Sequence, residues 1–261
     1  MSTIAVTGSQ AGMGLAIRRR LEEAGHRVIG VDLPGHGAEV DADLSNAPGR
    51  QAAVAAILAQ AGDTLDGLVC NAGVDNENIG LVFGVNYWGV VDLLTGLRPA
   101  LARAGRAAAV VNVSNSVHIT PNIPLEPVAA LTEGDAARAQ ELLQTQPHWA
   151  YQVSKFAVAR WLRRHAAAEM WAGSGITLNG ICPGAVMTDL LKKDLEDPRK
   201  REAIMGLPRP IGEFATPEAV GDLVEFLLSP RARFVVGQLI MIDGGQEVYF
   251  RRDALPVVWQ R

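Results

Sequence analysis

Short apolar runs rich in β-branched residues alternate with longer alanine- and leucine-rich stretches along the chain. The runs are apolar almost throughout, which indicates strands that are buried on both faces. Helices packed on both sides of a parallel sheet produce such burial. We therefore predict an α/β fold with a doubly wound parallel sheet and helices on both faces, a Rossmann fold. The expected strands are residues 3–7, 27–31, 67–70, 109–113, 177–181 and 239–242.

The longer stretches carry apolar residues at helical spacing. We predict a helix over residues 14–24 that ends at Gly25, and another over residues 152–171 that ends at Gly173 and Gly175, because glycine is common just past a helix end. No Ser/Gly-rich linker divides the chain, and 261 residues with 48% hydrophobic content fit one core. The sequence therefore predicts a single domain over residues 1–261.

Two segments depart from the regular alternation. Residues 117–147 carry prolines at positions 121, 124, 127 and 147 around a helical patch at residues 129–143. We predict that this segment is an insertion. Residues 188–216 follow a predicted strand, and we expect them to form a lid over the substrate.

Composition and charge exclude several classes of protein. The formal net charge is −4, with no long run of either sign, so no electrostatic footprint for nucleic acid is present. Cys70 and Cys182 lie in apolar runs without disulfide or metal-binding spacing, and we predict no metal site. We find no apolar run of the ~18 residues that a membrane span needs and no secretion signal. We expect a cytoplasmic protein that does not enter a membrane.

The first expected strand runs into a helix through the glycine-rich turn Thr7-Gly8-Ser9-Gln10-Ala11-Gly12-Met13-Gly14. Glycines at such a turn let the backbone bend tightly and bring N–H groups close to a pyrophosphate, whose charge the helix N-terminus stabilises. A tight turn without a ligand has the same sequence signature. The glycines therefore need support from elsewhere in the chain.

Asp32 supplies that support at the end of the second expected strand. It lies 18 residues after Gly14, close to the ~20 expected for the acidic residue that binds an adenosine ribose. Its carboxylate would repel a 2′-phosphate, and Leu33 and Pro34 supply no cation to receive one. The sequence therefore favours NAD over NADP, with an ordinary turn aspartate as the alternative.

Tyr151 and Lys155 stand four residues apart at the start of a predicted helix, which sets both side chains on one face. A phenol with an ordinary pKa near ~10 is a poor base at neutral pH. A neighbouring ammonium stabilises the phenolate, so we predict that Lys155 lowers the pKa of Tyr151. A packing tyrosine beside a solvated lysine is the alternative for the pair taken alone.

Taken in order, these motifs resemble the short-chain dehydrogenase/reductase family across nearly the whole chain. The matching pieces are residues 7–14, Asp32, Asp43-Leu44, Asn71-Ala72-Gly73, Asn86 in Val-Asn-Tyr-Trp-Gly, Ser114, Tyr151 with Lys155, Pro183-Gly184 with Thr188, and Asp243-Gly244-Gly245.

The resemblance implies a role for each matching residue. Tyr151 would be the general acid or base, Lys155 would also hold the nicotinamide ribose, Ser114 would bind the substrate oxygen, and Asn86 would complete a water-linked proton path. Asp43 and Leu44 would flank the adenine, and Thr188 would hold the carboxamide. The NAD-binding residues would be Gly8, Gln10, Gly12, Met13, Gly14, Asp32, Leu33, Asp43, Leu44, Asn71, Ala72, Gly73, Tyr151, Lys155, Pro183, Gly184, Val186 and Thr188.

The chain departs from the family pattern at two places. Ser114 and Ser116 are both candidates for the catalytic serine; we favour Ser114, which directly follows the strand and lies 28 residues after Asn86. The interval of 36 residues between Ser114 and Tyr151 is longer than is usual in the family. The family resemblance implies that such a segment would block the helix-bundle interface of tetramers. We therefore expect a homo-oligomer, with a dimer favoured and a tetramer as the alternative.

Apolar and aromatic residues near the expected mouth of the site suggest a hydrophobic substrate. They are His118, Ile119, Pro121, Ile123, Trp149, Met187, Leu190, Leu191 and Trp259. The candidate substrate contacts are His118, Trp149 and Met187 from this set, together with Ser116. No arginine is placed to clamp a carboxylate, although Lys192 and Arg209 lie in the predicted lid. We predict NAD-dependent interconversion of a hydrophobic secondary alcohol and its ketone. The sequence does not distinguish between a steroid, a terpene and an aryl alcohol as the substrate. A dihydrodiol dehydrogenase of the same family and a non-catalytic NAD sensor are the alternatives.

Overall fold

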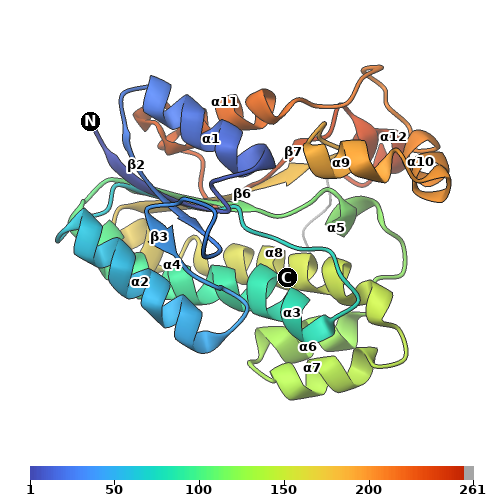
Figure 1. Ribbon diagram of the computed structural model, residues 1–261, viewed down its shortest axis with the longest axis horizontal. Helices are drawn as coiled ribbons and strands as arrows, with labels where there is room; N and C mark the ends of the chain where they lie inside the picture. Colours follow the sequence, from blue (N-terminus) through green and yellow to red (C-terminus); the bar gives the residue numbers. More distant parts are fainter. Residues whose placement is uncertain (256–261) are drawn as a thin grey trace.

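Seven parallel strands form one twisted sheet in the computed structural model, which describes residues 1–255 (Figure 1). Their order is β3-β2-β1-β4-β5-β6-β7, so the direction of winding reverses between β1 and β4. The strands are β1 (Thr3–Thr7), β2 (Arg27–Asp32), β3 (Val40–Asp41), β4 (Gly67–Cys70), β5 (Ala107–Asn112), β6 (Ile176–Pro183) and β7 (Leu239–Ile242).

Helices cover both faces of this sheet (Figure 1). On one face lie α1 (Gly12–Glu23) and α11 (Pro217–Leu228), and on the other lie α2 (Ala47–Ala61), α4 (Gly89–Arg103) and α8 (Ala150–His165). Every residue of β5 and β6 is buried, as helices on both faces require. The predicted Rossmann fold is confirmed.

The predicted strands lie within about two residues of the observed ones at each end, while one strand was not predicted and one helix needs correction. The strand that was not predicted is β3, two residues long, which has no apolar run of its own and forms by pairing with β2. The helix expected over residues 152–171 ends earlier, at His165, and a separate π-helical turn, η3 (Glu169–Gly173), follows. Ala168 between them is extended, so the chain leaves the helix there.

The segment of residues 117–147 packs outside the helical layer, next to α8 and α3 (Ile79–Phe83). It contains part of α5 (Ser116–Ile119), α6 (Leu125–Thr132), α7 (Ala136–Leu143) and the start of η2 (Pro147–Trp149). The single helical patch predicted at residues 129–143 is two helices. Gly134, with a φ of 90°, breaks the first, and Asp135 caps the second by accepting a 2.9 Å hydrogen bond from the N–H of Arg138.

The predicted lid lies over the carboxyl ends of the strands. It contains α9 (Asp189–Asp194) and α10 (Pro198–Met205), and α12 (Gln246–Arg251) lies beside it (Figure 1). A short 3₁₀ turn, η4 (Pro230–Ala232), follows α11. Ligands of open α/β sheets bind at this edge, where the winding reverses.

One helical stretch is long and apolar enough to cross a membrane, by length and composition. It is Ile79–Arg103, which joins α3, the π-helical turn η1 (Gly84–Trp88) and α4. The stretch is not an uninterrupted apolar run, because Asn86, Asp92 and Arg98 lie within it. Half of its most apolar window is buried inside the fold, and Leu93, Leu94 and Leu97 are fully buried in the main core. A helix buried in a protein core meets the same criterion of length and composition.

Candidate active site

The glycine-rich turn between β1 and α1 presents bare backbone at the start of the helix. Gly8 and Gly12 have φ angles of 64° and 52°, a region that side chains rarely enter. A Cβ on Gly14 would lie 1.8 Å from the carbonyl oxygen of Gly8, so no other residue fits without moving the backbone. This cradle fits a pyrophosphate at the N-terminus of α1.

Asp32 ends β2 beside this turn. Its Oδ2 accepts a hydrogen bond of 2.9 Å from the main-chain N–H of Gln10, and its Oδ1 accepts one of 2.9 Å from the N–H of Leu33. His36 Nδ1 lies 3.2 Å from the same Oδ1. The carboxylate is fixed next to the glycine turn, where an acceptor for ribose hydroxyls is needed.

Thr7 and Asn71 join the ends of β1 and β4, where the winding of the sheet reverses. Thr7 Oγ1 accepts hydrogen bonds of 3.0 Å from the main-chain N–H groups of both Asn71 and Ala72. Asn71 Nδ2 donates to the carbonyl oxygen of Thr7 at 3.2 Å. A Cβ on Gly73 would lie 3.2 Å from Lys155 Nζ. The backbone of residues 71–73 therefore runs from the glycine turn to the lysine.

Lys155 extends from α8 to the end of β5. Its Nζ donates a hydrogen bond of 2.7 Å to the carbonyl oxygen of Asn112, and Asn112 Nδ2 donates one of 2.9 Å to Asn71 Oδ1. The lysine is 3% exposed, and this burial lowers the pKa of its ammonium to about 8, against the opposing effect of two buried cysteines. The network sets one buried cation at a defined place in the site.

Tyr151 lies one helical turn before Lys155 on α8, and Lys155 Nζ is 5.9 Å from its ring centroid. Burial raises the pKa of the Tyr151 phenol, a hydrogen bond with the Ser114 side chain opposes that rise, and the charge of Asp75 adds to it. The predicted net lowering of this pKa is therefore wrong for the protein alone. Losing water around a phenolate has the larger effect here.

Ser114 and Ser116 differ in what they contact. Ser114 is buried, its side chain opposes the rise in the pKa of Tyr151, and its Oγ accepts a 3.1 Å hydrogen bond from the N–H of Ser116. Ser116 begins α5, and its Oγ is buried without a hydrogen-bond partner in the part of the chain that the structure describes. The fold brings Ser114 to the tyrosine.

Asn86 lies in η1, the π-helical turn between α3 and α4, and is fully buried. Its Oδ1 accepts a hydrogen bond of 2.8 Å from the N–H of Val74, and its Nδ2 donates to the Val74 carbonyl oxygen at 2.9 Å and to Ser154 Oγ at 3.1 Å. The side chain therefore ties the loop after β4 to α8. Its predicted part in a proton path stays a prediction.

The reactive side chains open onto a cavity of about 770 Å³ beneath the lid. Ser114, Tyr151 and Lys155 line it, together with the carboxylates of Asp75 and Asp194. Lys155 is the one cationic side chain of this lining among the described residues. Much of the rest of the wall is apolar and consists of Ile119, Pro121, Leu190, Leu191, Ile204, Leu207 and Phe250.

Comparison with known proteins decides the family. The family described as short chain dehydrogenase matches residues 2–125, and the one described as enoyl-(acyl carrier protein) reductase matches residues 136–247. The 3-alpha-hydroxysteroid dehydrogenase/carbonyl reductase of Comamonas testosteroni is 39% identical, over 96% of this chain and 98% of its own length. The chain belongs to the short-chain dehydrogenase/reductase family.

Other members of this family resemble the chain over nearly its full length. The 3-alpha-hydroxysteroid dehydrogenase of Pseudomonas sp. B-0831, solved in complex with NADH, is 43% identical with a TM-score of 0.90, over 97% of this chain and 99% of that one. The cis-4-hydroxycyclohexanecarboxylate dehydrogenase of Sinomonas cyclohexanicum is 31% identical, over 92% of this chain and 94% of its own length. The predicted family resemblance is confirmed.

Three of the four candidate substrate contacts lie outside the main cavity of this short-chain dehydrogenase. His118 lines a separate pocket with Phe156 and Arg251, and its carbonyl oxygen accepts a hydrogen bond from Arg251. Trp149 packs against the main core, and Met187 lines a groove beside Gly12. Ser116 lines the cavity, as do the neighbouring candidates Ile119, Pro121, Leu190 and Leu191, whereas Ile123 packs on the core. Trp259 lies outside the described residues.

The remaining cofactor candidates differ in their exposure to the cavity. Met13, Asn71, Gly73, Pro183, Gly184 and Thr188 line the cavity. Val186 and Leu44 have buried side chains, so they can offer a ligand little beyond their main chain. Asp43 accepts hydrogen bonds from the Ser45 N–H and Asn46 Nδ2, both at 2.9 Å. The Ser45 side chain first, and then these two donors, lower the pKa of its carboxyl. Thr188 Oγ1 caps α9 by accepting from the N–H of Leu191 at 3.3 Å.

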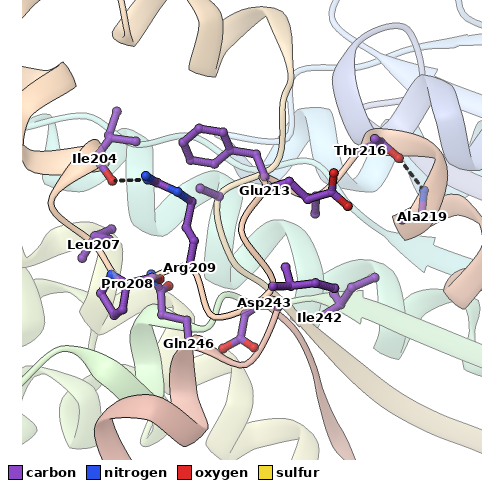
Figure 2. A pocket seen from close by; sticks show the side chains of 15 residues that line it. Ile204, Leu207, Pro208, Arg209, Glu213, Thr216, Ala219, Ile242, Asp243 and Gln246 are labelled. Carbon is purple, nitrogen blue, oxygen red and sulfur yellow. Dashed lines mark hydrogen bonds between the residues drawn. The ribbon is translucent and has the colours of Figure 1, made fainter.

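A second cavity of about 260 Å³ adjoins the first and shares Ala185, Ile204, Leu207 and Gln246 with it. Figure 2 shows Arg209 extending across it toward the carbonyl oxygen of Ile204, which accepts from Nη1 at 3.4 Å. The guanidinium also lies 4.8 Å from the Phe214 ring centroid. Lys192 pairs with Asp189 at 2.9 Å. Neither Lys192 nor Arg209 lines the main cavity.

Several side chains at the site carry no signal in the sequence. Asn115 Nδ2 donates a buried hydrogen bond of 2.6 Å to Gln246 Oε1, across 131 residues of chain. Asp75 follows the recognised Asn71-Ala72-Gly73 motif, and Asp194 lies in a lid without motifs. The only available signal for Gln246 is its place directly after Asp243-Gly244-Gly245.

Neither cysteine is placed for thiolate chemistry. Cys70 and Cys182 are both buried and unpaired, and burial raises the pKa of each thiol to about 12. Among the described residues, no group of three or more His, Cys, Asp or Glu side chains could hold a metal ion.

Proposed function

We propose that this short-chain dehydrogenase is an NAD-dependent enzyme that interconverts a hydrophobic secondary alcohol and its ketone. The observation that carries the proposal is the meeting of Tyr151, Ser114 and Lys155 in one largely apolar cavity, next to a glycine cradle that fits a dinucleotide. A buried acid–base group beside an apolar wall suits a carbonyl on a bulky hydrocarbon scaffold.

Tyr151 moves the proton in the proposed mechanism. During reduction its hydroxyl gives a proton to the substrate oxygen, and during oxidation the phenolate takes one from the alcohol. The chemistry that NAD supplies when bound is hydride transfer at the carbon. Ser114 lies beside Tyr151, and its one hydroxyl proton would be donated to the same substrate oxygen, which stabilises the charge that develops there.

Lys155 favours the ionised form of Tyr151 and orders the site. Its ammonium is held by the Asn112 carbonyl oxygen, and it keeps two further protons for ribose hydroxyls. In the free protein burial dominates the pKa of Tyr151. We propose that, when NAD is bound, its positive charge would add to that of Lys155. Together the two charges would bring the pKa of Tyr151 closer to neutral pH, as oxidation requires.

The choice of NAD rests on Asp32. Its carboxylate lies beside the glycine turn and accepts the N–H of Gln10. A 2′-phosphate at the same place would meet its negative charge. The solved relative from Pseudomonas sp. B-0831 is complexed with NADH, which supports the same choice for this chain.

We propose a steroid as the first substrate to test, with terpene and aryl alcohols as further candidates. Two of the relatives are named as 3-alpha-hydroxysteroid dehydrogenases. The lid residues Leu190, Leu191, Ile204 and Leu207 supply an apolar wall for a rigid ring system. A dihydrodiol dehydrogenase and an NAD sensor without activity are the alternative functions.

The test is NADH formation, followed by absorbance, with NAD and three matched sets of substrates: 3α-hydroxysteroids, terpene and aryl secondary alcohols, and cis-dihydrodiols. Turnover of the first two sets is expected. Turnover confined to the dihydrodiols would assign the enzyme to that activity. Tight NAD binding without turnover of any set would identify a sensor.

Tyr151→Phe is the control for the mechanism. It removes the hydroxyl and keeps the ring, so nearly all turnover should be lost while the Kd for NAD stays close to that of the unmodified protein. Retained turnover would show that another group moves the proton.

We also propose that the protein is a dimer in the cytoplasm. Helices α6 and α7 pack beside α8 and α3, where they would cover the helix-bundle surface that the family resemblance assigns to tetramers. Light scattering on the purified protein should give twice the mass of one chain. A tetramer would show that the insertion leaves that surface available.

A further inference from the structure

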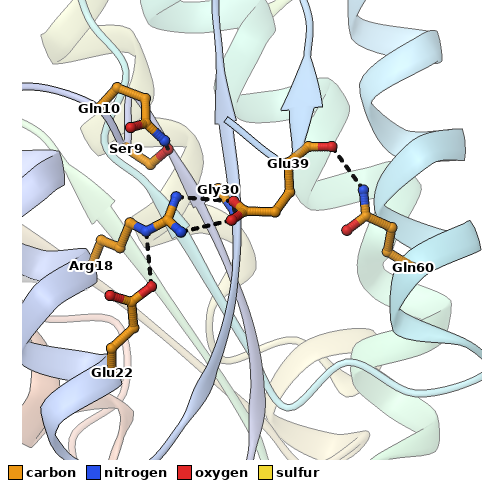
Figure 3. Close-up of polar contacts among 7 residues, drawn as sticks. All are labelled: Ser9, Gln10, Arg18, Glu22, Gly30, Glu39 and Gln60. Atoms are coloured by element: carbon orange, nitrogen blue, oxygen red, sulfur yellow. Dashed lines mark hydrogen bonds and ion pairs between the residues drawn. The ribbon is translucent and has the colours of Figure 1, made fainter. Parts of the chain in front are cut away.

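A cation lies beside the adenosine end of the proposed cofactor site. Arg18 extends from α1 toward Gly30 in β2 (Figure 3). A Cβ on Gly30 would lie 2.8 Å from Arg18 Nη1, 2.7 Å from Glu39 Oε2 and 2.5 Å from Ser9 Oγ. The glycine therefore makes room for three polar groups next to the glycine turn.

Gly30 and Asp32 lie on the same face of β2, because alternate residues of a strand point the same way. At a rise of ~3.3 Å per residue, the two positions are about 7 Å apart. Arg18 is thus within the reach of one side chain from the place where Asp32 would meet the ribose. A guanidinium there has the charge and geometry that bind a phosphate.

Glu39 holds this guanidinium in a bidentate ion pair. Arg18 Nη2 and Nη1 donate to Glu39 Oε1 and Oε2 at 2.6 and 3.0 Å, and Arg18 Nε donates to Glu22 Oε1 at 2.9 Å. All three guanidinium nitrogens are therefore engaged, with two carboxylates against one cation. Fork-to-fork pairs of this kind are stronger than single contacts.

Glu39 is itself fixed from other sides. Its Oε2 accepts a hydrogen bond of 2.8 Å from the main-chain N–H of Gly30, and its carbonyl oxygen accepts one of 2.9 Å from Gln60 Nε2. Burial disfavours ionisation of the carboxyl, but the hydrogen bonds from Arg18 and the main chain outweigh it and lower the pKa of Glu39. Contacts from β2 and α2 therefore hold Glu39 in place for its ion pair with Arg18.

We propose that Glu39 is a second determinant of NAD over NADP, because it holds Arg18 in the bidentate pair and so withholds from a 2′-phosphate the cation present beside the site. The inference rests on the proposed function, which places NAD at this turn. Asp32 repels the phosphate directly, and Glu39 removes its binding partner.

The test is the Kd for NADH and for NADPH, measured by titration of cofactor fluorescence without substrate. The variants are Asp32→Ser, Asp32→Ser/Glu39→Gln and Asp32→Ser/Glu39→Gln/Arg18→Met. Glutamine keeps an acceptor for the N–H of Gly30 and removes the charge. Relative to Asp32→Ser alone, the double variant should bind NADPH at least about tenfold tighter, as a charged hydrogen bond to phosphate provides. The triple variant should lose that gain.

Two further variants complete the test. Asp32→Ser/Glu22→Gln removes a carboxylate of equal charge that contacts Arg18 through one atom, so NADPH binding should change by less than about threefold, within ~0.7 kcal/mol. Asp32→Ser/Glu39→Asp keeps the charge, shortens the arm and should give a smaller gain than glutamine. This aspartate variant replaces the glutamine variant in the test if thermal unfolding shows that the glutamine variant does not fold.

The outcomes separate the inference from the proposed function. NADPH binding that is no tighter in the double variant than in Asp32→Ser, with NADH bound normally by the unmodified protein, overturns the inference alone. A gain that survives Arg18→Met overturns it as well. Failure of the unmodified protein to bind NADH overturns the proposed function.

Discussion

Lys155 Nζ donates a hydrogen bond of 2.7 Å to the carbonyl oxygen of Asn112, the residue that ends β5. This contact joins α8 to the sheet and sets the buried ammonium below the backbone of Gly73, whose Cβ would lie 3.2 Å from it. The same burial makes the lysine costly to keep charged, so function and stability should conflict at this position.

Lys155→Met should stabilise the free protein at pH 7. Burial lowers the folded-state pKa of Lys155 to about 8, below the ~10.4 of an unfolded chain. Between these values the unfolded chain binds more protons, so this group makes stability rise as pH rises, and its cost, on the order of 3 kcal/mol, is complete below pH ~8. Urea unfolding from pH 7 to pH 10 should show the rise in the unmodified protein and a flatter profile in the variant.

Lys192→Met is the matched control for that measurement. Lys192 is exposed and pairs with Asp189 on the surface, so its removal should change stability by less than about 1 kcal/mol at any of these pH values. Parallel pH profiles for the unmodified protein and Lys155→Met would contradict the prediction.

Ser114→Ala should lower kcat by about 100-fold or more, the usual cost of losing one donor to a developing oxyanion. Ser116→Ala should stay within a few-fold of the unmodified protein, because Ser114 is the serine that contacts Tyr151. Both variants should keep the Kd for NAD. The reverse pattern, with Ser116→Ala inactive, would move the catalytic role to α5.

Asp75→Asn should shift the pH profile of alcohol oxidation to lower pH. The Asp75 charge raises the pKa of Tyr151, and oxidation needs the phenolate, so the rate rises as pH passes that pKa. Removing the charge lowers the pKa, and the variant should reach its maximal kcat/KM at lower pH. Glu77→Gln, at an exposed position outside the cavity lining, should leave the profile in place. Identical profiles for Asp75→Asn and the unmodified protein would contradict this.

Gly14→Ala should abolish NAD binding or folding, because the added Cβ would lie 1.8 Å from the Gly8 carbonyl oxygen and the backbone would have to move. Gly80→Ala, in α3, is the control: its Cβ would lie no closer than 3.4 Å to its nearest neighbour, Gln140 Nε2, and alanine is favoured in a helix by up to ~1 kcal/mol. Thermal unfolding and NAD titration of both variants test this prediction. Normal binding by Gly14→Ala would contradict the close approach.

The local pattern of apolar and polar residues along the chain predicted most of the fold. The apolar runs predicted six of the seven strands because burial on both faces demands them. The strand that the pattern missed, β3, consists of Val40 and Asp41 and exists through its pairing with β2. Spacing placed Tyr151 and Lys155 on one face of α8, since the helical period relates residues four apart.

The amino-acid sequence by itself determined the order of strands and helices, the glycine cradle and the tyrosine–lysine pair, because these depend on neighbours along the chain. Tertiary packing decided which serine lies beside Tyr151, that His118 lines a different pocket, and that Glu39 engages Arg18. Packing also decided the net rise in the pKa of Tyr151. These properties depend on burial and on contacts between distant segments, which local periodicity does not encode.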